Sequence, residues 1–384
     1  MCETNSGMFT GCSLLSFRKN LLRWFAQFKR DLPWRLNQDP YRIWISEIML
    51  QQTRVAAAIP YYERFLAHFP NVGALADAPE EEVLRLWSGL GYYSRARNLQ
   101  KAAQQIMVQH RGIFPTCPRD VLALPGIGSY TAAAILSIAH GQKHAVLDGN
   151  VARVVARLEA LRGDLRVGGR WQEIQKTADA LIDPNAPGDW NQAMMELGAT
   201  ICSPRSPQCL LCPVNGWCEA RKRGLVDSIP EKRNKPATLE ITLAALVLVD
   251  AKGTTLLLSP PKSPAKSKVH ADIAALLSHL WHFPTIEVYR DAARELRSHV
   301  EDNLLRGKKL KGKLQLLKKV RHVVTYRSIT LLPFRLDLSP LPRLPHSKRV
   351  PLGELSSLAI SNLTRKVARS AQDESLTVIV SSPV

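Results

Sequence analysis

Four of the seven cysteines in this chain crowd into one short stretch near its middle. They follow the spacing C-x6-C-x2-C-x5-C at Cys202, Cys209, Cys212 and Cys218. An odd total number of cysteines argues against a disulfide framework and favours a metal site. Four thiolates can hold a [4Fe–4S] cluster or a structural zinc ion, and the spacing alone leaves both open. With all four ligands supplied by protein, the site is expected to be structural.

A glutamate lies in a mainly apolar segment that is expected to be helical. Glu47 has Ile43, Trp44, Leu50 and Gln51 three and four residues away, on its own side of such a helix. A carboxyl group on an apolar face loses hydration, which raises its pKa and suits it to act as a general acid. An ordinary glutamate on a helix surface is the alternative, and the spacing does not decide between the two.

A second carboxylate, Asp148, directly precedes a helix expected to start near Val151. The Gly149 and Asn150 that follow favour a turn, so the spacing alone favours a helix cap. Glycosidic bond cleavage gives a reason for two carboxyl groups. It needs an acid for the leaving group and negative charge beside the sugar cation.

A glycine pair lies in Leu124–Gly128, between helical stretches expected at Arg119–Leu124 and Tyr130–His140. Glycines one residue apart let backbone N–H groups approach a phosphate closely, and the following helix adds its positive end. A helix-hairpin-helix holds a DNA backbone in this way without reading its sequence. An ordinary helix–helix turn has the same pattern.

The overall composition favours a polyanionic partner. The formal net charge is +19 and the sequence pI is about 9.9, and lysine and arginine release counterions when they bind phosphates. A chain of 384 residues that is 45% hydrophobic is expected to form two packed domains. It has neither a long apolar run nor a signal pattern at Met1–Gly11, so we expect a cytoplasmic protein in contact with the genome.

Two regions of different character must position these residues. Apolar residues recur at helical spacing from about Ser16 to Leu225, which predicts an all-α domain. Pro230–Pro236 is charged and bracketed by prolines, as linkers often are. An α+β domain is expected beyond it. Its expected elements are strands at Leu239–Val249, Thr254–Leu258, Val323–Leu332 and Leu376–Val380, a helix at Ala292–Leu305 and a flexible loop at Lys262–Lys268.

Together these features resemble the endonuclease III-type helix-hairpin-helix glycosylases, and within them the branch that acts on adenine opposite 8-oxoguanine. The resemblance covers about residues 18–225. Besides the glycine hairpin and the cysteine loop, it rests on Asp31–Arg35, Ser46–Thr53, Gly89–Ala96 and Asp148–Asn150.

The resemblance implies a glycosylase domain at 16–229 with a [4Fe–4S] cluster loop at 202–218, a linker at 230–237 and a Nudix-like lesion-recognition domain at 238–384. The implied substrate is duplex DNA with an adenine mispaired with 8-oxoguanine or guanine. We expect a monomer without a membrane partner.

The family also implies roles for individual residues. Glu47 would protonate the adenine ring and later activate water, and Asp148 would stabilise or transiently bond the sugar cation, supported by Tyr130 and Asn150. Gln52 and Tyr92 would fill the space left by the flipped base. The further implied DNA contacts are Thr53, Leu90, Gly126, Gly128, Arg30, Trp34, Thr325 and Tyr326. Glu196 is expected to support the fold.

One position separates the subfamilies. Bifunctional relatives carry a lysine immediately before the threonine that follows the hairpin, where it forms a Schiff base. This chain has Tyr130 there. The substitution predicts a monofunctional glycosylase with little strand nicking.

The region beyond the linker is similar to the Nudix-like domain of the same family through Leu280–Pro284 (Leu-Trp-His-Phe-Pro). It lacks the acidic helix motif of a Nudix hydrolase, so we expect lesion recognition and not hydrolysis. The family's Phe-Ser-His recognition loop corresponds here to Val324, Thr325 and Tyr326, which depart from that pattern. A run of cations at Lys308–Arg321 precedes it, and we favour phosphate contact over a merely solvated face.

Two other functions remain open. A thymine or uracil mismatch glycosylase could use the same fold, although the appended recognition domain argues against it. A non-catalytic DNA-binding module could use the hairpin and the basic face, although the pair of carboxylates argues against that.

Overall fold

The computed structural model describes residues 11–231, 237–259, 280–324 and 326–380. The loop expected at Lys262–Lys268 and the residue Thr325 lie outside this part, as does most of the expected linker. The chain forms two compact units. One comprises the residues up to Ala78 and 97–234, and the other comprises 79–96 together with 235 to the end.

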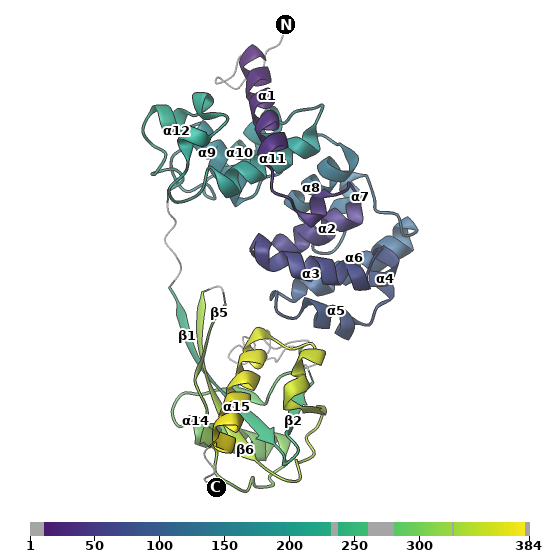
Figure 1. Ribbon diagram of the computed structural model, residues 1–384, viewed down its shortest axis with the longest axis vertical. Coiled ribbons are helices and arrows are strands. Elements are labelled where there is room, and N and C mark those ends of the chain that lie inside the picture. Colours follow the sequence, from purple (N-terminus) through teal and green to yellow (C-terminus); the bar gives the residue numbers. More distant parts are fainter. Residues whose placement is uncertain (1–10, 232–236, 260–279, 325, 381–384) are drawn as a thin grey trace. The chain divides into compact units, whose positions relative to one another are not determined.

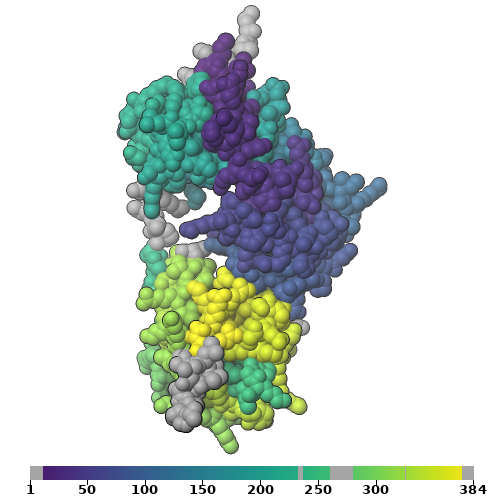
Figure 2. Space-filling model, in the orientation of Figure 1, coloured from purple at the N-terminus to yellow at the C-terminus, as the bar shows by residue number. Residues whose placement is uncertain are grey.

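The first unit consists of helices, which confirms the prediction from apolar spacing (Figure 1). Helix α1 packs against α11, and both share with α9 a core that contains Trp190 and Phe17, which are almost fully buried. In Figure 2 the purple helix α1 lies directly against the teal α9–α12 region. The elements of this unit are α1 (Gly11–Phe28), η1 (Pro33–Arg35), α2 (Pro40–Leu50), α3 (Val55–His68), α4 (Val72–Asp77), α6 (Ser94–His110), α7 (Pro118–Leu122), α8 (Ser129–His140), α9 (Gly149–Leu158), α10 (Arg170–Leu181), α11 (Pro187–Thr200), η2 (Cys209–Leu211), η3 (Asn215–Trp217) and α12 (Glu219–Lys222).

Helix α2 is fixed at its start and along its length. The Asp39 side chain accepts a hydrogen bond from the Tyr41 N–H, and Pro40 occupies the first helical position, where its missing N–H costs nothing. Ile45 and Met49 are fully buried. Because this packing fixes the rotation of α2 about its axis, it also fixes where Glu47 points.

The second unit is built on a mixed sheet whose main strand order is β4-β6-β1-β2-β7. Strand β1 is buried on both faces, as a near-continuous apolar run predicts. Alternate β1 residues form a core with α15 on one side and a core with α14 on the other. The elements are α5 (Glu80–Trp87), β1 (Leu239–Val249), β2 (Thr254–Leu258), β3 (Thr285–Glu287), α14 (Ala292–His299), η4 (Val300–Leu304), β4 (Gln315–Leu316), β5 (Val320–Val324), β6 (Arg327–Asp337), β7 (Ser347–Pro351), η5 (Leu352–Ser357) and α15 (Asn362–Val380).

Two of the expected strands need correction. The stretch Val323–Leu332 is not one strand, because the chain turns between β5 and β6 and pairs them antiparallel. The stretch Leu376–Val380 is the end of helix α15. Its β-branched residues favour a strand locally, but α15 begins at Asn362 and packs on the sheet, and that tertiary context overrides the local preference. The hairpin of β1 and β2 and the helix near Ala292 are confirmed.

Within the described ranges, no helix is both long enough and apolar enough to cross a membrane.

Candidate active site

A cavity of about 500 Å³ opens in the first unit, with a wall made by α2, α8, α9 and α11. It brings together all four residues that were expected at a catalytic centre: Glu47, Tyr130, Asp148 and Asn150. Four of the expected DNA-contacting residues also line it: Arg30, Trp34, Gln52 and Thr53. Its size is within the usual range for a site that takes one small ligand group.

Glu47 is 6% exposed on the inner face of α2. Burial raises the pKa of its carboxyl group from 4.5 to about 7, and the charge of Asp148 adds to this, while a Tyr130 hydrogen bond and Arg35 oppose it. This direction is what its apolar neighbours predict. A carboxyl group with such a pKa still carries a proton near neutral pH and can donate it.

Asp148 both caps helix α9 and lines the cavity. Its Oδ1 accepts hydrogen bonds from the Asn150 N–H at 2.9 Å and the Val151 N–H at 2.7 Å, and its Oδ2 accepts one from Asn150 Nδ2 at 3.1 Å. The cap and a catalytic role are therefore compatible. The N–H groups that Asp148 caps at the start of α9 also orient its carboxylate.

Arg153 connects this carboxylate to the cysteine loop. Its Nη2 donates to Asn150 Oδ1 at 2.9 Å and to the Gly198 carbonyl at 2.7 Å, and its Nε donates to the Cys202 carbonyl at 2.8 Å. The side chain is 6% exposed. One buried guanidinium thus fixes Asn150 relative to α11 and the loop that follows it.

Gly198 of α11 approaches α9 too closely for any side chain. A Cβ atom there would lie 2.8 Å from the Asn150 Cβ and 3.1 Å from its carbonyl. We expect Gly198→Ala to displace Asn150, to cost about 1–3 kcal/mol of stability and to slow base release by roughly 10- to 100-fold. Thermal unfolding and single-turnover assays measure the two effects.

Gly216→Ala is the control for that substitution, because a Cβ at Gly216 meets no atom within 4 Å. A fully active Gly198→Ala protein would contradict the expected displacement of Asn150.

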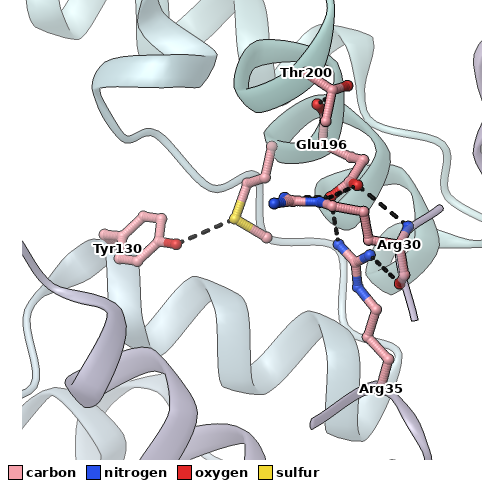
Figure 3. A network of polar contacts seen from close by, with 6 residues as sticks. Arg30, Arg35, Tyr130, Glu196 and Thr200 are labelled. Atoms are coloured by element: carbon pink, nitrogen blue, oxygen red, sulfur yellow. Dashed lines mark hydrogen bonds and ion pairs between the residues drawn. The ribbon is translucent and has the colours of Figure 1, made fainter. Parts of the chain in front are cut away.

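The Tyr130 hydroxyl is close to both Glu47 and Met195. It lies 3.1 Å from Met195 Sδ (Figure 3) and also hydrogen-bonds with Glu47. One hydroxyl proton cannot serve both acceptors, and a thioether accepts weakly. When Glu47 is protonated it can donate to the Tyr130 oxygen, which leaves the tyrosine proton for sulfur. Burial and the two carboxylates raise the pKa of Tyr130, so its hydroxyl stays protonated.

Glu196 forms a buried ion-pair cluster at the cavity wall. Its carboxylate accepts from Arg30 Nε at 2.6 Å and from Arg35 Nη2 at 2.9 Å (Figure 3). Burial acts to raise its pKa, but the hydrogen bonds and charges of the two arginines outweigh burial and keep the pKa below its usual value. Glu196, Arg35 and Gln51 line the cavity, and the sequence did not indicate this.

The hairpin residues have the geometry that backbone contact requires. Gly126 has φ +80°, and a Cβ there would lie 2.8 Å from the Asn98 Cβ. Gly128 caps helix α8, and a Cβ there would meet nothing within 4 Å, so its surface is open. Gln52, at the cavity, also has a positive φ of 56°.

The other expected DNA contacts belong to the second unit. Leu90 and Tyr92 lie in the 79–96 segment, where Tyr92 is 40% exposed and has φ +48°. Tyr326 lies beside the β5–β6 turn, is 43% exposed, and has the Arg327 guanidinium 4.6 Å from its ring centre.

The four cysteines of the 202–218 loop are all half-buried. Burial raises the pKa of the Cys212 thiol to about 12, and the other three cysteines act on it as neighbouring charges. Arg157 donates to Cys202 Sγ at 3.3 Å, and a cation so placed suits a loop that holds thiolates. In the described part of the chain, no three His, Cys, Asp or Glu side chains converge to hold a single ion. Four cysteine thiols are the donor set that a [4Fe–4S] cluster requires.

Comparison with known proteins assigns this geometry to a family. A family model described as "HhH-GPD superfamily base excision DNA repair protein" matches residues 45–184, and "Iron-sulfur binding domain of endonuclease III" matches residues 202–218. The adenine DNA glycosylase of Mus musculus is 34% identical over 93% of this chain and 78% of its own length. The chain belongs to the adenine DNA glycosylase family.

The chain is also similar to other DNA glycosylases. The Homo sapiens adenine DNA glycosylase is 48% identical over 54% of this chain, which spans 40% of that protein's length. The solved structure of a thermostable thymine-DNA glycosylase is 28% identical, covers 55% of this chain and has a TM-score of 0.51. The chain is thus a DNA N-glycosylase of base excision repair, and its cysteine loop is the [4Fe–4S] loop of this family.

The cluster assignment has a direct test. We expect purified protein to be brown, with broad visible absorption from thiolate-bound iron, and to contain about four iron atoms per chain. Metal analysis and a visible spectrum measure this. A colourless protein containing one zinc atom would contradict the assignment.

Proposed function

We propose that this protein is a monofunctional glycosylase that removes adenine mispaired with 8-oxoguanine or guanine in duplex DNA. The observation that carries the proposal is Glu47, a buried carboxyl group with a pKa of about 7 in a cavity that also contains Asp148. A buried acid and a second carboxylate in one cavity are what glycosidic bond cleavage requires. Membership of the family supplies the substrate base.

The proposed reaction uses a flipped adenine in the cavity. Glu47 gives its proton to a ring nitrogen of the base, which improves the leaving group. As the bond to the sugar breaks, positive charge develops on the sugar ring, and the Asp148 carboxylate stabilises it. Glu47, now ionised, accepts a proton from the attacking water. Tyr130 and Asn150 hold the two carboxyl groups in place.

The ion-pair cluster of Arg30, Arg35 and Glu196 offers a polar wall for the base. Guanidinium groups donate hydrogen bonds in fixed directions, and each arginine here is already oriented by Glu196. Trp34 adds a flat apolar surface on the same wall. We propose that these residues recognise the edge and face of adenine in addition to supporting the fold.

We propose that Gln52, Thr53, Leu90 and Tyr92 replace the flipped base in the duplex, and that Gly126 and Gly128 hold the phosphate backbone. The proposal of these DNA contacts rests on the positions of the residues in the motifs, on the exposure of Tyr92 and on the open surface at Gly128. Such contacts hold a duplex without reading its sequence.

The region 238–384 is proposed to be a Nudix-like domain that reads the opposite base through Thr325 and Tyr326. Residues 306–371 contain sixteen lysines and arginines and two acidic residues, so +14 of the net charge of +19 lies there. That concentration of charge supports binding to phosphates. We also propose the domain limits 16–229 and 230–237, a monomeric state and a cytoplasmic, nucleoid-associated location.

A panel of lesion duplexes tests the substrate. We expect adenine release from A:8-oxoguanine and A:G pairs, detected as strand breaks only after alkali opens the abasic site. Release of thymine or uracil from G mispairs would favour the mismatch glycosylase alternative, and binding without any release would favour a DNA-binding module.

Tyr130 at the lysine position provides a further prediction. The protein is expected to give no covalent complex with abasic DNA on borohydride reduction, because it lacks the amine for a Schiff base. Tyr130→Lys is expected to gain such a complex, since the side chain lines the cavity. Efficient trapping of the unmodified protein would refute monofunctional chemistry.

A further inference from the structure

In the second unit, the start of helix α15 holds the loop Ser88–Tyr93. The Asn362 Nδ2 donates a hydrogen bond to the Gly89 carbonyl at 2.9 Å, and the Arg365 Nη2 donates one to Ser88 Oγ at 2.8 Å. Helix α15 is fixed at this end, because Ser361 Oγ accepts from the Thr364 N–H at 3.0 Å. The loop is therefore attached to a firm end of the helix.

A second point of attachment is the Ile360 carbonyl, just before α15. It accepts hydrogen bonds from Ser88 Oγ at 2.7 Å and from the Tyr93 hydroxyl at 3.1 Å. The Gly89 N–H lies 3.4 Å from the Tyr93 hydroxyl oxygen and donates to it. Ser88 is only 5% exposed, and hydrogen bonds away from water are stronger than exposed ones. The network fixes both ends of the loop.

The middle of the loop needs such support. Gly89, Gly91 and Tyr92 all have positive φ, at 117°, 74° and 48°. A tyrosine in the left-handed region persists only where its surroundings determine the conformation. Arg95 contributes from within the segment, because its Nη2 donates to the Gly91 carbonyl at 3.2 Å and its guanidinium lies 5.6 Å from the Tyr92 ring centre. The result is a partly exposed aromatic ring on a restrained backbone, with a guanidinium close to it.

We propose that Asn362 and Arg365 are positioning residues that orient Tyr92 for insertion into the duplex. The region beyond the linker then takes part in base flipping directly, separately from any reading of the opposite base. Without the two donors, the left-handed loop relaxes and Tyr92 loses its fixed direction. The inference rests on the proposed function, in which Tyr92 fills the space left by the flipped base.

The test compares Asn362→Ala and Arg365→Ala with Asp373→Ala, which changes an exposed polar residue of the same helix. We expect the two loop-facing variants to lower the single-turnover rate of adenine release by about tenfold, and Asp373→Ala to change it less than twofold. The same duplex with 2-aminopurine, a fluorescent adenine analogue, reports flipping before any bond is cut. Its fluorescence increase is expected to fall in parallel.

A double-mutant cycle separates positioning from a general structural effect. If Asn362 acts through Tyr92, then Asn362→Ala is expected to cause no further loss in a Tyr92→Ala background. An equal loss in both backgrounds overturns the proposal, as does full activity of both loop-facing variants.

Asn362→Asp keeps the shape of the side chain and replaces the donor by an acceptor, so it serves if the alanine variants fail to fold. Thermal unfolding identifies that failure. If the unmodified protein releases no adenine, the proposed function fails. The 2-aminopurine comparison still decides the inference, because flipping precedes bond cleavage.

Discussion

Replacing Glu47 by glutamine is expected to abolish adenine release and, at the same time, to stabilise the folded protein at alkaline pH. Glutamine has nearly the same shape but cannot donate a proton to a leaving base. General acid catalysis contributes roughly 10²- to 10⁴-fold to a rate. Glu47 has a second proposed task in activating water, so we expect the loss to reach the upper end of that range.

The effect on stability follows from the raised pKa of Glu47. Its pKa is about 7 in the folded protein against 4.5 for an unburied glutamate, mainly because of burial. The folded state therefore prefers the protonated form. Below pH 4.5 Glu47 is protonated in both the folded and the unfolded state, so its burial costs no stability. As pH rises towards 7 the free energy of unfolding falls, and above that the full loss of about 3 kcal/mol applies.

Thermal unfolding at pH 5 and pH 8 measures this linkage. Glu47→Gln is expected to match the unmodified protein at pH 5 and to exceed its melting temperature at pH 8. The adenine release rate of the unmodified protein is expected to fall as pH rises above about 7, where Glu47 loses its proton. Glu63→Gln, on the exposed side of α3, is the control and should change neither property.

Retained activity in Glu47→Gln would refute the assignment of the general acid. A gain in stability of equal size at both pH values would show that packing, and not charge, is responsible.

The sequence predicted much of this site because its key signals are local. The apolar neighbours of Glu47 indicated burial and a raised pKa but did not exclude a surface position, and the turn residues after Asp148 predicted a helix cap that the structure confirms. Asp148 also shows the limit of such signals. Spacing favoured the cap over catalysis, and only the cavity shows that the capped carboxylate also faces Glu47's pocket.

Features that depend on distant partners were not predictable. Glu196 was expected to support the fold, but nothing near it in the sequence indicates its ion pairs with Arg30 and Arg35, which lie more than 160 residues away. The hydrogen bonds between α15 and the loop Ser88–Tyr93 join segments that are far apart in the sequence, since Asn362 and Gly89 are 273 residues apart. The strand expected at Leu376–Val380 was wrong because these residues continue helix α15, which begins at Asn362 and packs on the sheet.

Replacing Asp148 by asparagine is expected to separate the two roles of that residue. Asparagine caps helices as well as aspartate does, so its side-chain oxygen can still accept from the Asn150 and Val151 N–H groups, and only the bond from Asn150 Nδ2 is lost. We expect a change in stability below about 1 kcal/mol. The negative charge beside the sugar is lost, and adenine release is expected to fall by roughly 10²- to 10³-fold.

The pH profile of the remaining activity distinguishes an electrostatic role from simple misplacement. The charge of Asp148 contributes to the raised pKa of Glu47, so its removal is expected to lower that pKa. The alkaline limb of the profile should therefore move to lower pH, whereas a merely displaced residue would lower the rate at every pH alike.

Asp39→Asn is the matched control, because Asp39 caps α2 in the same way and does not line the cavity. It should leave the rate and the profile unchanged. If Asp148→Asn lost stability in proportion to activity, the carboxylate would be acting mainly as a cap. A large loss of rate in a stable protein, together with the acid shift of the profile, would instead show that the two carboxyl groups work as one electrostatic pair.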